Sequence, residues 1–222
     1  MTTARPTLIF DLDGTLLDTL PSLLTSINHA MATHGYPLCS RQQVRAALGN
    51  GIEQLVRQCE PSHLTPSQHT ALFETFRTHY ADHCDIGTAP YAGILDLLAT
   101  LHTEGYAMAI VTNKVDAAAQ QLHEQYFAPS VAFTIGEREG MPRKPAPDGV
   151  HLAMQLLNAT PQHTIYIGDS EVDLATARNA GLHCISLTWG FRDEHELIAH
   201  GATTIAHTTE ELHHAITIHF NH

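Results

Sequence analysis

The sequence predicts an α/β protein: a doubly wound, Rossmann-like parallel sheet into which an all-α helical domain is inserted. Two observations predict this fold. Six short apolar runs recur along the chain, and helical patterns separate the later runs, which is the alternation typical of a parallel sheet with helices on both faces. The first and second runs are some 96 residues apart, although a crossover between parallel strands needs only a dozen or more residues.

The six apolar runs are rich in β-branched residues and are continuously apolar rather than alternating. This pattern suits strands that are covered on both faces, as the strands of a parallel sheet are. We expect strands at residues 7–10, 107–111, 132–135, 164–167, 183–188 and 202–206.

Helical patterns lie between the strands, as a doubly wound sheet requires. Residues 91–104 can supply the crossover before the second strand, and three further helices are expected at 115–126, 147–158 and 173–180. Pro147 suits the first turn of its helix, and Gly181 suits the position just past a helix end.

Residues 17 to about 85 exceed what the first crossover needs, and they have a helical pattern throughout. Four helices are expected there, at 21–35, 40–48, 51–60 and 65–83. We therefore predict a core domain of residues 1–16 and 86–222 and a helical insert of residues 17–85. Polar connectors at about 14–19 and 84–91 would be the hinges between the two domains.

Composition narrows the function. The chain has 222 residues with a formal charge of −12, which argues against a nucleic-acid partner. No run approaches the roughly 20 apolar residues of a membrane span, and the first residues lack the apolar centre of a signal peptide. We expect a cytoplasmic protein that binds neither nucleic acid nor a membrane.

The cysteines and histidines give no clear metal signature. The four cysteines are scattered without a close pair, which predicts free, buried thiols. Among the 18 histidines, His195 and His200 are five residues apart, so on a helix they face different directions, whereas the zinc motif needs a spacing of four. We interpret the histidines as solvated surface residues.

Chemically active residues follow four of the predicted strands, and the ligand crevice of such a sheet lies at these carboxyl ends. The residues are Asp11 and Asp13 after the first strand, Thr112, Asn113 and Lys114 after the second, Arg143 and Lys144 in the loop after the third, and Asp169 and Asp173 after the fourth. If the sheet forms, these distant parts of the chain meet at one edge.

Carboxylates gathered in this way would repel each other, and some of their pKa values would rise. A hard divalent cation such as Mg²⁺, which prefers oxygen ligands, would relieve the repulsion. Lys144 could hold an anion opposite the cation, and Thr112 could donate a hydrogen bond to it. Such a site suits phosphoryl transfer, in which one of Asp11 and Asp13 attacks phosphorus and the other moves a proton.

Four segments appear in the order of the motifs of a known superfamily. They are "DLDGT" at 11–15, "VTNK" at 111–114, "RKPAPD" at 143–148 and "GDSEVD" at 168–173. With them the chain resembles the haloacid-dehalogenase-like (HAD) phosphatases over nearly its whole length, and the helical insert resembles their cap. "LGNGIEQLV" at 48–56 makes the phosphoglycolate phosphatase-like branch the nearest resemblance.

The resemblance implies roles for the acidic residues. Asp11 would be the nucleophile and Asp13 the general acid and base. Mg²⁺ would be bound by Asp11, Asp169 and the backbone carbonyl of Asp13. Asp173 would support the metal through water or orient Lys144.

The resemblance also implies how the phosphate is bound. Thr112 and Asn113 would bind phosphate, and Lys144 would steady both the phosphate and the nucleophile. Asn50 lies between two glycines in the insert, where it is either part of a tight turn or a specificity residue pressed onto the substrate.

The expected function is thus a Mg²⁺-dependent phosphatase of a small phosphorylated metabolite, with 2-phosphoglycolate as the best candidate, working as a monomer or a homodimer. A phosphomutase resembling β-phosphoglucomutase is the second possibility, and a pyrophosphatase or nucleotidase of the same fold is the third. A signalling receiver domain is disfavoured, because its acceptor aspartate follows a later strand and it has no helical insert.

Overall fold

The computed structural model describes residues 5–221, which divide into two compact units. Of the described residues, one unit comprises 5–17 and 90–221, and the other comprises Asp18–Ala89. The predicted boundaries, before residue 17 and after residue 85, lie within a few residues of this division. None of the described helices is long and apolar enough to span a membrane.

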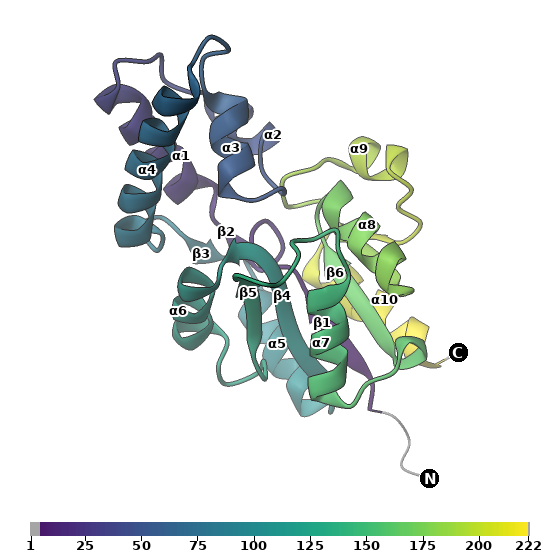
Figure 1. Cartoon of the computed structure of the whole chain (residues 1–222). Helices are drawn as coiled ribbons and strands as arrows, with labels where there is room; N and C mark the ends of the chain where they lie inside the picture. The colour runs from purple at the N-terminus through teal and green to yellow at the C-terminus, as the bar shows by residue number, and fades with distance from the viewer. Residues whose placement is uncertain (1–4, 222) are drawn as a thin grey trace. The chain divides into compact units, whose positions relative to one another are not determined.

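The first unit contains a six-stranded sheet in the order β5-β4-β1-β6-β7-β8 (Figure 1), and every neighbouring pair in it is parallel. Phe10 of β1 is in register with Ile110 of β4 and Ile167 of β6, so these three central strands approach their carboxyl ends together. The strands are β1 (Thr7–Phe10), β4 (Ala107–Val115), β5 (Thr134–Glu137), β6 (Thr164–Gly168), β7 (His183–Leu187) and β8 (Ile205–Ala206).

Helices cover both faces of this sheet, and each face has its own apolar cluster (Figure 1). Leu8 and Phe10 point into the cluster on one face and Ile9 into the cluster on the other, which is why the run is continuously apolar. The first cluster contains residues of α5 (Ile94–Thr103), α6 (Asp116–Tyr126) and α10 (Thr209–Asn221), and the second contains residues of α7 (Asp148–Leu157) and α8 (Glu171–Ala180).

The doubly wound fold class is confirmed, but three local predictions were wrong. Pro147 is the N-cap residue of α7 rather than part of its first turn. Strand β4 continues to Val115, beyond the predicted end at residue 111. The last predicted strand, 202–206, is reduced to β8, because only two of its residues pair with β7.

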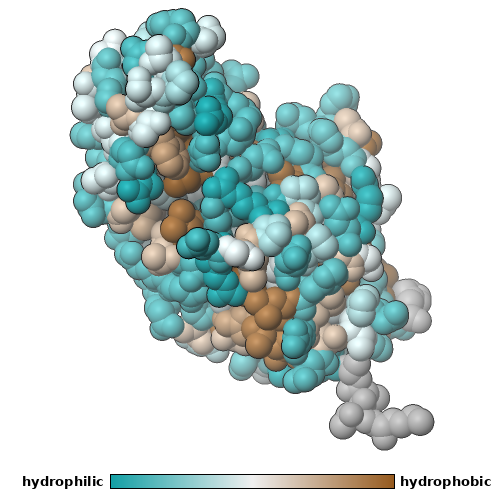
Figure 2. Space-filling model, in the orientation of Figure 1, coloured by the Kyte–Doolittle hydropathy of each residue, from teal (hydrophilic) through white to brown (hydrophobic). Residues whose placement is uncertain are grey.

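The C-terminal part of the unit contains two helices that the sequence analysis did not anticipate, α9 (Glu194–Ala199) and α10. Helix α10 buries Leu212 and Ile216 in the sheet's first cluster. The interpretation of the histidines as solvated was also wrong for some of them, since His69 and His123 are buried. On the face seen in Figure 2 most of the surface is nevertheless hydrophilic.

The second unit is helical. Its helices are α1 (Leu20–Thr33), α2 (Arg41–Ala46), α3 (Ile52–Cys59) and α4 (Pro66–His83). Ser40 is the N-cap residue of α2, and Thr65 is the N-cap residue of α4. Each forms a capping box, in which its side-chain oxygen accepts the backbone N–H of the residue three positions later. The connecting strands β2 (Leu17–Asp18) and β3 (Ala89–Pro90) pair with each other where the chain leaves and re-enters the first unit.

Candidate active site

The two neighbouring aspartates after β1 have different lysine partners. The Asp11 N–H donates to the Ile167 carbonyl at 2.9 Å, which holds this residue at the end of the strand with its side chain buried. Asp11 Oδ1 lies 2.8 Å from Lys144 Nζ, whereas Asp13 Oδ1 lies 3.0 Å from Lys114 Nζ. The chain can therefore place two like charges close together, because each is paired with its own cation.

Asp169 follows β6 and is fully buried. Its Oδ1 accepts from the Thr15 hydroxyl at 2.8 Å, and its Oδ2 accepts from the Phe191 N–H at 2.7 Å. A Cβ atom on Gly14 would lie 2.4 Å from Asp169 Oδ2, and one on Gly190 would lie 2.3 Å from it. Glycine at both positions is therefore what lets the chain close around this carboxylate.

Asp173 lies in the first turn of α8 with both of its oxygens engaged. Its Oδ2 accepts from the Asp169 N–H and from the N–H and hydroxyl of Ser170. Its Oδ1 accepts from Lys144 Nζ at 2.8 Å and from the Tyr166 hydroxyl at 3.0 Å. With these five donors the carboxylate has a fixed orientation, and it directs the Lys144 ammonium toward Asp11.

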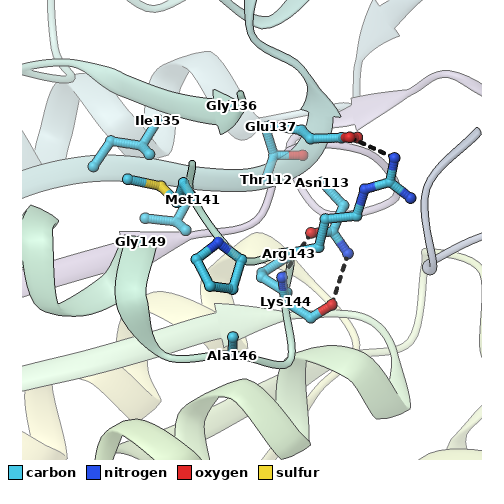
Figure 3. Close-up of a pocket in the computed structure, with 12 residues that line it drawn as sticks. Thr112, Asn113, Ile135, Gly136, Glu137, Met141, Arg143, Lys144, Ala146 and Gly149 are labelled. Carbon is cyan, nitrogen blue, oxygen red and sulfur yellow. Dashed lines mark hydrogen bonds and ion pairs between the residues drawn. The ribbon is translucent and has the colours of Figure 1, made fainter. Parts of the chain in front are cut away.

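Lys144 is buried, and the loop that carries it is fastened by Asn113 (Figure 3). The Asn113 amide nitrogen donates to the Lys144 carbonyl at 3.1 Å, and its amide oxygen accepts the Lys144 N–H at 2.8 Å. Sequence analysis assigned Asn113 to phosphate binding, which stays a prediction. In the structure it holds the backbone from which the Lys144 ammonium reaches Asp11 and Asp173.

Thr112 is buried in the carboxyl-terminal half of β4, and its hydroxyl accepts the Lys114 N–H at 3.2 Å. A small pocket lies beside it, lined on one side by Thr112, Asn113 and Lys144 (Figure 3). Arg143, the cation next to Lys144, points away from Lys144 and pairs with Glu137 at the rim of the same pocket.

Three carboxylates gather at this edge of the sheet. Asp11, Asp169 and Asp173 are all buried and present oxygens within 4.8 Å of one another. The carboxylate of Asp13 is not part of this group. Lys144, which pairs with two of the three, supplies one positive charge against three negative ones.

The pKa values reflect this imbalance. Burial, together with Asp173 and Asp13, raises the pKa of Asp11 to about 7 in spite of Lys144. Burial and then the charges of Asp173 and Asp11 raise the pKa of Asp169 well above its ordinary value. Burial also opposes the charge on Asp173, but Lys144 and the hydrogen bonds from Ser170 and Tyr166 together outweigh it and lower this pKa. An oxygen-rich, underneutralised group of this kind fits a hard divalent cation such as Mg²⁺.

Several residues of the site gave no usable signal in the sequence. Tyr166 lies inside an apolar strand, where an aromatic ring indicates core packing. Thr15 has the position of a turn residue after Gly14. Phe191 contributes only its backbone N–H, which any residue other than proline could supply. Lys114 was expected at this edge of the sheet, but its ion pair with Asp13 was not, because that pair depends on the close approach of β1 and β4.

The acidic residues lie within a segment that matches a known family. A family model of haloacid dehalogenase-like hydrolases matches residues 8–187, which include all of the acidic residues above. The chain belongs to the haloacid dehalogenase-like hydrolase family.

Relatives within this family are phosphatases. A phosphoglycolate phosphatase of Mesorhizobium japonicum is 30% identical over 92% of both chains. An N-acetylmuramic acid 6-phosphate phosphatase of Pseudomonas aeruginosa is 30% identical over 92% of this chain and 91% of its own. The crystal structure of a protein described as a putative phosphoglycolate phosphatase, from Lactobacillus delbrueckii subsp. bulgaricus, superposes with a TM-score of 0.91. The two sequences are 35% identical, and the match covers 96% of this chain and 99% of that chain. The chain is thus a phosphatase of the phosphoglycolate phosphatase-like branch.

One predicted site residue lies in the other unit. Asn50 is exposed in the bend between α2 and α3, flanked by Gly49 and Gly51 with φ values of 112° and 83°. These left-handed glycines account for the tight turn. A contact of Asn50 with substrate stays a prediction.

Proposed function

We propose that this phosphatase is Mg²⁺-dependent and hydrolyses a small phosphomonoester through an aspartyl phosphate on Asp11, with 2-phosphoglycolate as the first candidate substrate. The observation that supports this most strongly is the group of three buried carboxylates against a single lysine charge. A site with this surplus of negative charge can accept a dianionic phosphate only when a cation is present. The candidate substrate comes from the relative of M. japonicum.

Mg²⁺ would be held by Asp11, Asp169 and the backbone carbonyl of Asp13, where it would neutralise charge on the phosphoryl group. The oxygens of Asp173 are already committed to five donors, so its part is to fix Lys144 rather than to bind the ion directly. Thr15 and the Phe191 N–H hold Asp169 in place from behind.

Asp11 is the nucleophile in this proposal. Its carboxylate oxygen attacks phosphorus, the bond from phosphorus to the leaving oxygen breaks, and an aspartyl phosphate forms. Lys144 favours the ionised form of Asp11 and orients it, since their charged atoms are 2.8 Å apart. The Thr112 hydroxyl, the backbone N–H of Asn113 and the positive charge of Lys144 would bind the phosphate oxygens.

Asp13 is the general acid and base. It gives its proton to the leaving alkoxide, and it then accepts a proton from the water that attacks the phosphorus of the aspartyl phosphate. The Lys114 ammonium nitrogen lies 3.0 Å from an oxygen of the Asp13 carboxylate. This ion pair keeps the Asp13 carboxylate apart from the three carboxylates of the metal-binding group.

The unit Asp18–Ala89 would be the cap domain of the enzyme, closing over the substrate to exclude bulk water. Asn50 would then select the substrate from the cap side. We place the enzyme in the cytoplasm, and both a monomer and a homodimer are compatible with the proposed chemistry.

A second substrate class belongs in the assay, because one relative acts on a sugar phosphate, N-acetylmuramic acid 6-phosphate. The test is phosphate release from a panel of 2-phosphoglycolate, sugar phosphates, nucleotides and pyrophosphate, with Mg²⁺ and with EDTA. We expect Mg²⁺-dependent release that is fastest with a small phosphomonoester and is abolished in Asp11→Asn, with the circular dichroism spectrum unchanged.

Different results from the same panel would contradict the proposal. Isomerisation of a sugar phosphate without phosphate release would indicate a phosphomutase. Preferential cleavage of pyrophosphate would indicate a pyrophosphatase, and preferential cleavage of a nucleotide would indicate a nucleotidase. Full activity in EDTA, or in Asp11→Asn, would contradict the metal-assisted nucleophile itself.

A further inference from the structure

Two of the four cysteines lie together in the helical unit. Cys39 lies in the segment between α1 and α2, and Cys59 is the last residue of α3. The Cys39 sulfur lies 3.8 Å from the Cys59 carbonyl oxygen, and the two thiols also interact directly through their side chains. Both are free thiols, Cys39 buried and Cys59 partly exposed.

We propose that Cys39 and Cys59 are a redox-sensitive pair that closes to a disulfide when the protein meets a hydroperoxide. Two hydrogen bonds hold the backbone of Cys39 in place. The Asn28 amide donates to the Cys39 carbonyl at 3.0 Å and accepts the Cys39 N–H at 2.7 Å. Cys39 is thus fastened to α1 while Cys59 is carried by α3, so a bond between them would tie two separate elements together.

The chemistry needs one thiolate and one resolving thiol. The side-chain hydrogen bond with Cys59 lowers the pKa of Cys39 against the opposing effect of burial, so Cys39 is the thiol that ionises more readily. The Cys39 thiolate attacks one oxygen of hydrogen peroxide, the O–O bond breaks, and a sulfenic acid and hydroxide form. The hydroxide takes up the proton that the Cys39 thiol released and becomes water. The Cys59 sulfur then attacks the sulfenic sulfur, the S–O bond breaks, and a second water leaves. Two thiols are oxidised by two electrons in total, and one hydroperoxide is reduced.

The position of the pair in the chain suggests a consequence for substrate binding. Helix α2, the turn at Gly49, Asn50 and Gly51, and the rest of helix α3 lie between the two cysteines. A disulfide would close this segment into a loop and restrict its movement. On the proposed function, in which Asn50 meets the substrate, we expect oxidation to change the KM several-fold and kcat less.

The test begins from the double variant Cys84→Ser, Cys184→Ser, which keeps only the pair. It is treated with hydrogen peroxide, digested without reduction and mapped by mass spectrometry. We expect one cross-linked peptide that contains Cys39 and Cys59, the loss of both titratable thiols, and full reversal by dithiothreitol. The matched control adds Cys39→Ser to the same background and should give no cross-link, and Cys39→Ala serves if the serine variant is misfolded by circular dichroism.

The outcomes separate the two parts of the proposal. Thiols that survive excess peroxide, thiols oxidised to sulfinic acid without a cross-link, or a cross-link only between two molecules would each overturn the disulfide. A disulfide that forms and leaves the KM unchanged would overturn the effect on substrate binding. Activity that is absent before any oxidation bears on the proposed function alone, because the cross-link is detected without an activity assay.

Discussion

The ammonium nitrogen of Lys144 lies 2.9 Å from the phenol oxygen of Tyr166, and both side chains are buried. The same nitrogen lies 2.8 Å from an oxygen of Asp11 and 2.8 Å from an oxygen of Asp173. An ammonium group has three protons, and here three oxygens surround it. Lys144 is therefore held in one orientation, and in the proposed mechanism it would act on a phosphate by its charge rather than through a spare donor.

Tyr166→Phe tests this relationship by removing one oxygen of the three. The Lys144 ammonium then loses its fixed direction, so we expect kcat to fall about tenfold, the equivalent of about 1.4 kcal/mol of barrier, with KM nearly unchanged. Tyr106→Phe, a phenol outside the site, is the control. Steady-state kinetics are decisive, and a change in KM rather than kcat would assign Tyr166 to substrate binding.

Asp13→Asn tests the proton-transfer role through the leaving group. The variant cannot protonate a leaving alkoxide, so we expect kcat for an alkyl phosphate to fall by about 10²–10⁴-fold. A nitrophenyl phosphate has a leaving group that needs little protonation, and its first step should suffer much less. Burst kinetics with the two substrates measure the difference, and an equal loss of the first step with both would contradict general acid catalysis by Asp13.

Gly190→Ala tests how closely the chain surrounds Asp169. The new Cβ would lie 2.3 Å from Asp169 Oδ2 and 2.4 Å from the Gly14 carbonyl, so the carboxylate must move. We expect Mg²⁺ affinity to fall at least about tenfold, since misplaced ligands bind Mg²⁺ poorly. Gly105→Ala is the control, because it has a left-handed φ of 94° but nothing within 4 Å of the new atom. Unchanged Mg²⁺ titration in Gly190→Ala would refute the prediction.

Metal removal should affect stability in a pH-dependent way. Burial raises the pKa of Asp11 to about 7, and that of Asp169 is also raised, so without metal the folded state favours their protonated forms. A raised carboxyl pKa stabilises the fold at low pH, and this contribution is lost as the pH rises from about 4 through 7. Mg²⁺ replaces those protons, so it should stabilise the protein more at pH 8 than at pH 5.

The measurement is thermal unfolding with saturating Mg²⁺ and with EDTA. At 100 times the Kd, bound Mg²⁺ contributes about 2.7 kcal/mol, which raises the Tm of a protein of this size by roughly 5–10 °C. We expect this shift at pH 8 and little of it at pH 5. Asp169→Asn should show a small shift at both. Equal shifts of the unsubstituted protein at the two pH values would argue against carboxylate protonation as the cause.

The sequence was sufficient to predict the parts of the site that follow from topology. Asp11 and Asp169 were predicted because each follows an apolar run, and the register of β1 between β4 and β6 brings them to one edge. The continuous apolar character of the runs correctly predicted strands that are covered on both faces, because Leu8 and Ile9 point to opposite faces of the sheet and both faces are covered.

What the sequence could not supply depends on distances between side chains. Asn113 was assigned to phosphate by its type, but which backbone its amide would reach depends on how the loop of Lys144 folds. The pairing of Lys114 with Asp13 and of Lys144 with Asp11 likewise depends on distances between side chains, which the sequence does not give. Helix α10 was not predicted, because Leu212 and Ile216 are its buried residues in a segment otherwise rich in histidine, threonine and glutamate.

The proposed chemistry requires a covalent bond between phosphorus and the carboxylate of Asp11, and borohydride trapping detects that bond directly. The enzyme is mixed with Mg²⁺ and 2-phosphoglycolate, treated with borohydride, digested and sequenced by mass spectrometry. Because borohydride reduces an acyl phosphate to an alcohol, we expect homoserine at position 11 in the turning-over enzyme and none in Asp11→Asn. Homoserine at position 13 or 169, or its absence while phosphate is being released, would contradict Asp11 as the nucleophile.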